Sequence, residues 1–134
     1  MTTDEKNEYV RYRLESADKT FQAAKLLADN KFFNSAVNRL YYAVFYAVNA
    51  LLVNEGIITQ SHSGIKSQFS LHFIKTGRLS KEFGKLFAQL YDWRQKSDYE
   101  TMVDFSSESV NSLFDPVSEM ITEIETVVKK SLEQ

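Results

Sequence analysis

The chain has 134 residues, of which 43% are hydrophobic, and it contains four glycines, one proline and no cysteine. This length is typical of one domain, so we expect residues 1–134 to form a single domain. The lack of cysteine excludes disulfides, thiolate metal sites and cysteine nucleophiles. The amino terminus lacks the basic-then-apolar order of a signal peptide. The longest nearly apolar run, residues 40–53, is shorter than the ~20 residues that cross a bilayer, so we expect a cytoplasmic protein with no membrane segment.

The net charge of −2 is unevenly distributed. Residues 60–100 hold seven Lys or Arg against four acidic residues, a local charge of +3, and residues 101–134 hold seven acidic residues against two lysines, a local charge of −5. Because nonspecific nucleic-acid binding needs many phosphate contacts from one basic face, this pattern argues against a large uniform RNA- or DNA-binding surface. It allows a local site for an anionic ligand in the middle third, and equally allows solvated helix faces.

Apolar residues recur every three or four positions between the few glycines, which predicts an all-α protein. Thr2 and Glu5 have the spacing of a capping box at the start of a first helix, over about residues 4–29. The second helix, over about 32–55, is the most apolar, and Gly56 follows it as a residue type that adopts a left-handed cap. We expect this second helix to be the central element.

Turn residues over 57–63 precede a third predicted helix, which ends at Gly77. Ser80 can cap a fourth helix, and Arg94 continues the apolar stripe of that helix at helical spacing.

The fifth predicted helix covers about residues 106–132. Pro116 either kinks it or begins a new helix with Asp115 as the capping residue.

Common enzyme signatures are absent from the sequence. A di-iron bundle needs glutamate three residues before each histidine, but Thr59 precedes His62 and Phe69 precedes His72 at that spacing. The phosphate-binding loop, the dinucleotide-binding glycine motif and the serine hydrolase motif are also missing. We therefore expect neither a metal nor a cofactor.

Polar residues interrupt the apolar stripes of two predicted helices. On the second helix, Asn38 and Tyr42 lie one turn apart on one face, and Arg39 lies beside them. On the fourth helix, Arg94 and Asp98 are separated by four residues. These residues predict either an intrahelical salt bridge beside packed tyrosines, or a helix-lined site in which Arg94 binds phosphate in a bidentate manner.

Three segments together resemble the HEPN (higher eukaryotes and prokaryotes nucleotide-binding) domain family, in its short stand-alone prokaryotic branch. They are the Asn-Arg-Leu-Tyr-Tyr-Ala-Val-Phe run at 38–45, the His-Ser-Gly-Ile run at 62–65 and the Arg-x-x-x-Asp-Tyr motif at 94–99. The resemblance covers about residues 10–130. It implies an up-and-down bundle of four to five helices that forms a homodimer through the face bearing the arginine motif. It also implies a small nucleotidyltransferase as the partner in a toxin–antitoxin pair.

Catalytic members of that family are metal-independent ribonucleases with an arginine followed, after four to six residues, by a histidine. The resemblance places this arginine at Arg94, but the three possible histidine positions hold Tyr99, Glu100 and Thr101. Cleavage of RNA needs groups that exchange protons near neutral pH, as histidine does. The missing histidine therefore predicts binding without catalysis.

The alternative is a metal-independent endoribonuclease with a variant motif, in which Arg94 acts with Asp98, Tyr99 or, from outside the motif, His62. The unperturbed pKa values of Asp and Tyr, about 3.9 and 10, suit this role poorly. The predicted catalytic residues are Arg94, Asp98 and Tyr99. The predicted nucleotide- or RNA-binding residues are Asn38, Arg39, Tyr42, His62 and Arg94.

Overall fold

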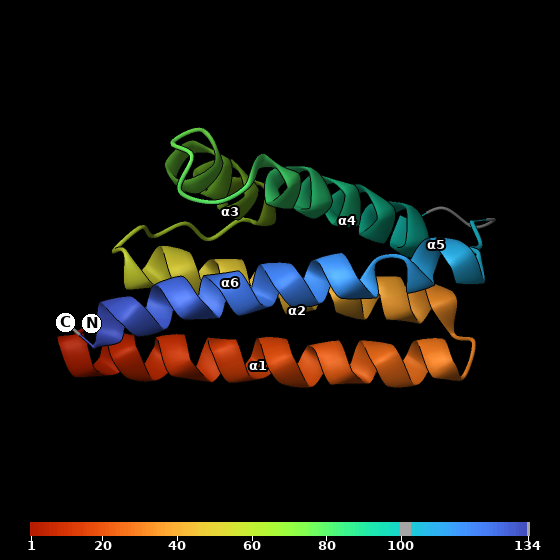
Figure 1. The fold of residues 1–134 in the computed structure, drawn as a ribbon, viewed down its shortest axis with the longest axis horizontal. Coiled ribbons are helices and arrows are strands. Elements are labelled where there is room, and N and C mark those ends of the chain that lie inside the picture. The colour runs from red at the N-terminus through yellow and green to blue at the C-terminus, as the bar shows by residue number, and fades with distance from the viewer. Residues whose placement is uncertain (100–102, 134) are drawn as a thin grey trace.

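The computed structural model describes residues 1–99 and 103–133, which fold as a bundle of helices (Figure 1). Helices α1 (Thr3–Asp29) and α2 (Phe33–Asn54) form an antiparallel hairpin, and α6 (Phe114–Leu132) packs against both. Helix α4 (Lys81–Tyr99) packs on another side of α2. This arrangement confirms the predicted all-α bundle, with α2 in contact with every long helix.

The predicted ends of the first two helices are confirmed. The Thr2 hydroxyl accepts a hydrogen bond from the Glu5 N–H at 3.1 Å, and the Glu5 carboxylate accepts one from the Thr2 N–H at 3.5 Å, which completes the capping box. After α2 the chain turns at Gly56 with a φ of 76°, a left-handed conformation that glycine adopts without a steric penalty.

Helix α2 supplies most of the core. Twelve of its residues are buried, so it is surrounded by protein along most of its circumference. By length and composition it could cross a membrane, but 61% of its most apolar window is buried inside the bundle. Its apolar character is accounted for by contacts with α1, α4 and α6.

The third helix begins earlier than predicted. Helix α3 (His62–Phe69) is capped by Ser61, whose hydroxyl accepts a hydrogen bond from the Gly64 N–H at 2.9 Å. His62 is therefore the first helical residue and not part of the preceding loop, because Ser61 provides an N-cap that the turn-like composition of this segment concealed. A π-helical turn η1 (Ser70–Ile74) continues α3, and the chain leaves it at Gly77 with a φ of 77°.

The predicted fifth helix is divided in two. Helix α5 (Ser107–Asn111) ends and α6 begins at Phe114, with Leu113 at the capping position. A fresh start near Pro116 is thus confirmed and a kink is wrong, but Asp115 is inside the helix and is not its cap. Pro116 occupies the first turn of α6, where backbone N–H groups have no helical partner and the missing N–H costs nothing.

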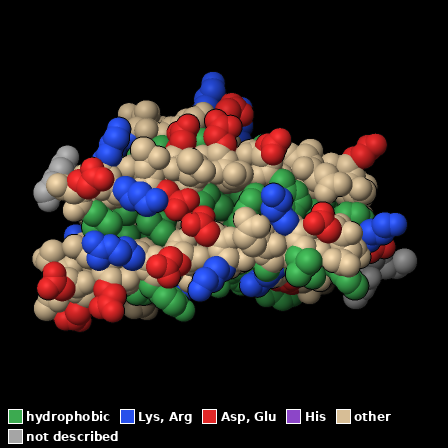
Figure 2. Space-filling model, turned by 60° about the horizontal axis from the view of Figure 1, so that its bottom comes forward, with side chains coloured by type: hydrophobic (Ala, Val, Ile, Leu, Met, Phe, Trp, Pro, Cys, Tyr) green, Lys and Arg blue, Asp and Glu red, His purple; other side chains and the backbone are tan. Residues whose placement is uncertain are grey.

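Acidic and basic side chains are interspersed over the face of the bundle that Figure 2 presents. This face lacks the single-sign charge that a large nucleic-acid-binding surface requires. An anion site on this face would therefore be local.

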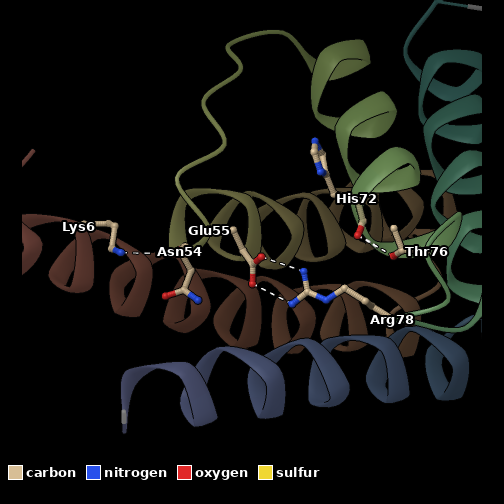
Figure 3. A network of polar contacts seen from close by, with 6 residues as sticks. All are labelled: Lys6, Asn54, Glu55, His72, Thr76 and Arg78. Atoms are coloured by element: carbon tan, nitrogen blue, oxygen red, sulfur yellow. Dashed lines mark hydrogen bonds and ion pairs between the residues drawn. The ribbon is translucent and has the colours of Figure 1, made fainter.

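An ion pair fixes the end of α2 to the segment before α4 (Figure 3). The two terminal nitrogens of Arg78 donate to the two carboxylate oxygens of Glu55 at 2.8 and 2.9 Å, and the guanidinium lies 4.4 Å from the centre of the Phe73 ring. The hydrogen bonds from Arg78 hold the pKa of Glu55 below its ordinary value. Nearby, the Lys6 ammonium donates to the Asn54 carbonyl at 3.3 Å, which joins α1 to the same end of α2.

We predict that Glu55→Gln lowers the free energy of unfolding by up to about 1 kcal/mol near neutral pH, since the pair is bidentate but partly exposed. The pKa of Glu55 is lower in the folded state, so its contribution is present above the unfolded pKa and is lost as the pH falls through the folded pKa. Urea unfolding at about pH 7 and about pH 3 checks this. Glu82→Gln, in a more exposed pair with Lys85, is the control. An equal loss for Glu55→Gln at both pH values would contradict the prediction.

Candidate functional site

One stripe of α2 stays only half-buried between α1 and α4. Its residues recur at helical spacing, whereas the positions on either side of the stripe are buried. Figure 1 shows α1 on one side of α2 and α4 on the other. The stripe consists of Asn38, Arg39, Tyr42, Phe45, Tyr46 and Asn49. It carries three of the predicted site residues, and Arg94 reaches it from α4.

The guanidinium of Arg94 is enclosed by tyrosines of α2. Its Nη1 donates to the Tyr42 hydroxyl at 2.9 Å, and its Cζ lies 4.9 Å from the centre of the Tyr41 ring and 5.7 Å from that of Tyr42. Its Nε is buried and has no hydrogen-bond partner among the described residues. Burial disfavours the charge, but the Tyr42 hydroxyl offsets this effect and the pKa of Arg94 stays above its ordinary value. The Arg94 side chain therefore stays positively charged, and its Nε–H donates no hydrogen bond among the described residues.

The predicted ion pair between Arg94 and Asp98 does not form in the described part of the chain. Asp98 instead accepts a hydrogen bond from the Asn38 side-chain amide, at 3.3 and 3.5 Å to its two carboxylate oxygens. The amide on the neighbouring helix is a closer partner for the Asp98 carboxylate than the guanidinium one turn earlier on α4. Since buried charges in proteins are usually paired, a half-buried arginine that contacts phenol rings and no carboxylate indicates a site for an anion.

His62 joins the Arg94 cluster from α3. Its Nδ1 shares a hydrogen bond of 2.8 Å with the hydroxyl of the fully buried Tyr41, and its ring stacks on Phe45 at 4.4 Å between centres. Burial, and then the nearby charge of Arg94, lower the pKa of His62. Burial also raises the pKa of Tyr41, so its hydroxyl stays protonated. The neutral imidazole of His62 is thus held near the guanidinium of Arg94, although the two residues are far apart in the sequence and His62 is not part of the arginine motif.

Asn38, Arg39 and Asp98 line an adjoining pocket of about 500 Å³ at the ends of α1, α2 and α4. Arg39 donates to the Asn38 side-chain oxygen from Nε at 3.1 Å and from Nη2 at 2.8 Å. Its guanidinium lies 5.0 Å from the centre of the Tyr42 ring, on which Arg94 also packs. Tyr42 therefore connects this pocket with the Arg94 cluster.

One predicted residue, Tyr99, lies apart from this arrangement. Tyr99 lies at the end of α4 with 77% of its surface exposed, and Glu100 and Thr101 lie outside the described residues. Over residues 1–99 and 103–133, no three His, Asp or Glu side chains converge in a way that could hold a metal ion. Tyr41 and Phe45 also belong to the site, and neither was among the predicted site residues. In the sequence, they are marked only by the concentration of aromatic residues over 38–45.

The fold and the site define a class of small helical-bundle proteins with an arginine–tyrosine cluster between two helices. The sequence matches the HEPN domain over residues 10–127, so the chain belongs to the HEPN family, as its motifs predicted.

Curated proteins with similar sequences include a UPF0332 protein and two proteins named as putative toxins. A UPF0332 protein of Thermotoga maritima is 36% identical over 126 residues, covering 94% of this chain and 96% of that protein. Two proteins of Methanocaldococcus jannaschii are named "Putative toxin MJ0142" and "Putative toxin MJ0605". The first is 35% identical over 100 residues, covering 75% of this chain and 68% of its own. The second is 30% identical over 127 residues, covering 95% and 91%. The chain is therefore a HEPN protein whose relatives include two proteins named as putative toxins.

We predict that His62 titrates below the ordinary histidine value of 6.5 and that Arg94→Gln raises its pKa part of the way back, because burial, the larger cause, remains. Imidazole resonances followed by NMR against pH measure this. Arg11→Gln, which removes an equal charge from an exposed position on α1, should leave the titration unchanged. A His62 pKa at or above 6.5 would contradict the arrangement.

Proposed function

We propose that this toxin-like HEPN protein binds the phosphate of a nucleotide or of RNA at Arg94, without cleaving it, as a cytoplasmic homodimer paired with a small nucleotidyltransferase. The observation that carries the proposal is the half-buried guanidinium of Arg94. It has an unused N–H, neutral tyrosine neighbours and no ion pair among the described residues. Because the Nε–H is buried, an anion would bind through the terminal N–H groups of the half-buried guanidinium, which forms no ion pair among the described residues.

The half-buried stripe of α2 supports the homodimer. Its half-buried aromatic members, Tyr42, Phe45 and Tyr46, leave apolar surface that would line a cleft between this chain and a second copy. HEPN proteins are expected to dimerise through the face that bears the arginine motif, and here that face contains the stripe. A two-fold pairing would place two Arg94 clusters in one cleft.

The names of the relatives support a toxin–antitoxin role. Two of them are named as putative toxins, and a protein of that kind fits a module in which a partner restrains it. The motif resemblance suggests a nucleotidyltransferase as that partner.

We predict that Arg94→Ala weakens binding of RNA or nucleotide by about tenfold or more, since a charge-assisted hydrogen bond contributes about 1.5–3 kcal/mol. Fluorescence anisotropy with a labelled oligoribonucleotide measures the change, and pull-down of the co-expressed nucleotidyltransferase tests the partner. Arg11→Ala is the control of equal charge. If the Arg94→Ala variant binds nucleotide, RNA and the partner as tightly as the unsubstituted protein does, the proposed role of Arg94 is refuted.

A second candidate function, metal-independent RNA cleavage, is favoured by the position of His62. When Nδ1–H donates to the Tyr41 hydroxyl, Nε2 can take the proton of a ribose 2′-hydroxyl. The 2′-oxygen then forms a bond to the adjacent phosphorus, the bond from phosphorus to the 5′-oxygen of the next nucleotide breaks, and that 5′-oxygen takes a proton from water. Arg94 would stabilise the charge that develops on the phosphate oxygens. The lowered pKa of His62 keeps the imidazole neutral near pH 7, as a general base requires.

If this reaction occurs, His62→Ala and Arg94→Ala each lower the rate of cleavage by about 10²-fold or more, in the presence of a chelator. His72→Ala, on η1 with Gln68 as its partner, is the matched control and should cleave normally. Gel analysis of RNA for products with 2′,3′-cyclic phosphate ends is the measurement. Complete stability of RNA with the unsubstituted protein would leave binding as the function.

A further inference from the structure

A third arginine, after Arg94 and Arg39, lies beside the site, on α1. The Cζ of Arg13 lies 5.0 Å from the centre of the Tyr46 ring, 5.3 Å from that of Tyr9 and 5.9 Å from that of Tyr12. Its Nε donates to the Tyr9 hydroxyl at 3.1 Å, and that hydroxyl donates to Asn49 of α2 at 2.8 Å. The guanidinium is therefore held in place by neutral groups and is not a mobile surface charge.

Arg13 has no carboxylate partner among the described residues. The positions three and four residues away on either side, which share its face of α1, hold Tyr9, Val10, Ser16 and Ala17. Arg78, by contrast, is fully engaged by Glu55. Arg13 thus repeats the character of Arg94, a half-buried cation packed on tyrosine rings with no counter-ion.

The two arginines belong to one continuous surface. Tyr42, which binds Arg94, and Tyr46, which packs on Arg13, are neighbours with ring centres 5.9 Å apart. They are one turn of α2 apart, a rise of about 6 Å. We call the four residues Arg94, Tyr42, Tyr46 and Arg13 the arginine–tyrosine strip. It runs along the half-buried stripe of α2 from α4 to α1.

We propose that the arginine–tyrosine strip binds a single strand of RNA, with one phosphate at Arg94 and a second phosphate of the same strand at Arg13. The inference rests on the proposed function and deepens it, because one phosphate at Arg94 alone would suit a mononucleotide. Two guanidinium groups that pack on neighbouring tyrosine rings, Arg94 on Tyr42 and Arg13 on Tyr46, call for a ligand with phosphates in series. Tyrosine faces between them offer stacking surfaces for unpaired bases, which a duplex does not present.

The composition of the strip favours RNA over an acidic protein segment. A protein partner is recognised mainly through a buried apolar centre with polar groups at the rim, whereas the centre of this strip is a line of cations and phenol rings. Tyr12, whose ring also faces Arg13, keeps 61% of its surface exposed and can stack on a further base.

The test compares the full-length protein with Arg13→Ala, Arg94→Ala and Arg11→Ala, using two probes, the octanucleotide of uridine and uridine monophosphate. We expect Arg13→Ala to bind the octanucleotide about tenfold more weakly and the mononucleotide normally. The slope of log affinity against log salt should fall by about 0.7, the value for one phosphate contact with a single strand. Arg94→Ala should weaken both probes, and Arg11→Ala, an exposed residue of the same helix, should weaken neither.

The outcomes separate the two proposals. If Arg94→Ala weakens binding of the octanucleotide but Arg13→Ala lowers this affinity no more than Arg11→Ala does, the second phosphate position is wrong. The proposed function then still stands. If Arg94→Ala affects neither probe, the proposed function fails. If Arg13→Ala changes the mass of the assembly in light scattering and leaves the octanucleotide affinity intact, Arg13 belongs to a protein contact and the inference is overturned. Arg13→Lys, which keeps the charge, should retain the salt slope of the unsubstituted protein.

Discussion

The structure depends on the burial of α2. This helix is apolar along most of its circumference, so α1, α4 and α6 must pack around it to remove that surface from water. Three covering helices leave one stripe half-buried, and every polar group of the candidate site lies on that stripe or reaches it from a neighbouring helix. The site is thus the part of the core helix that the bundle does not cover. Its rigidity follows from its position on packed helices.

The electrostatics of the stripe are unusual because its arginines contact tyrosines where carboxylates would be expected. A phenol ring attracts a guanidinium modestly and leaves its charge intact. Acidic residues are plentiful in the chain, but the one nearest the site, Asp98, is bound by Asn38. The stripe therefore keeps positive charge and free donors although the protein as a whole is slightly acidic. Such a local site is compatible with a surface of mixed charge elsewhere (Figure 2).

The fold could be read from the sequence to within a few residues, because capping residues and helical spacing act locally. The capping box at Thr2 and the left-handed glycine at position 56 stand where predicted. The errors have local causes too. Ser61 started α3 before the expected residue, and the segment before Pro116 broke into α5 and α6.

The sequence by itself determined that the protein is a HEPN-type helical bundle, that its second helix is central and that Arg94 continues an apolar stripe. These properties follow from hydrophobic periodicity and short motifs, both of which depend only on residues close together in the sequence. Only the tertiary structure decided that Asp98 binds Asn38, that His62 binds Tyr41 beside Arg94 and that Arg13 packs on Tyr46. Such pairings depend on how helices distant in the chain cross and on which rotamers fit between them. The spacing within one helix does not encode either of these.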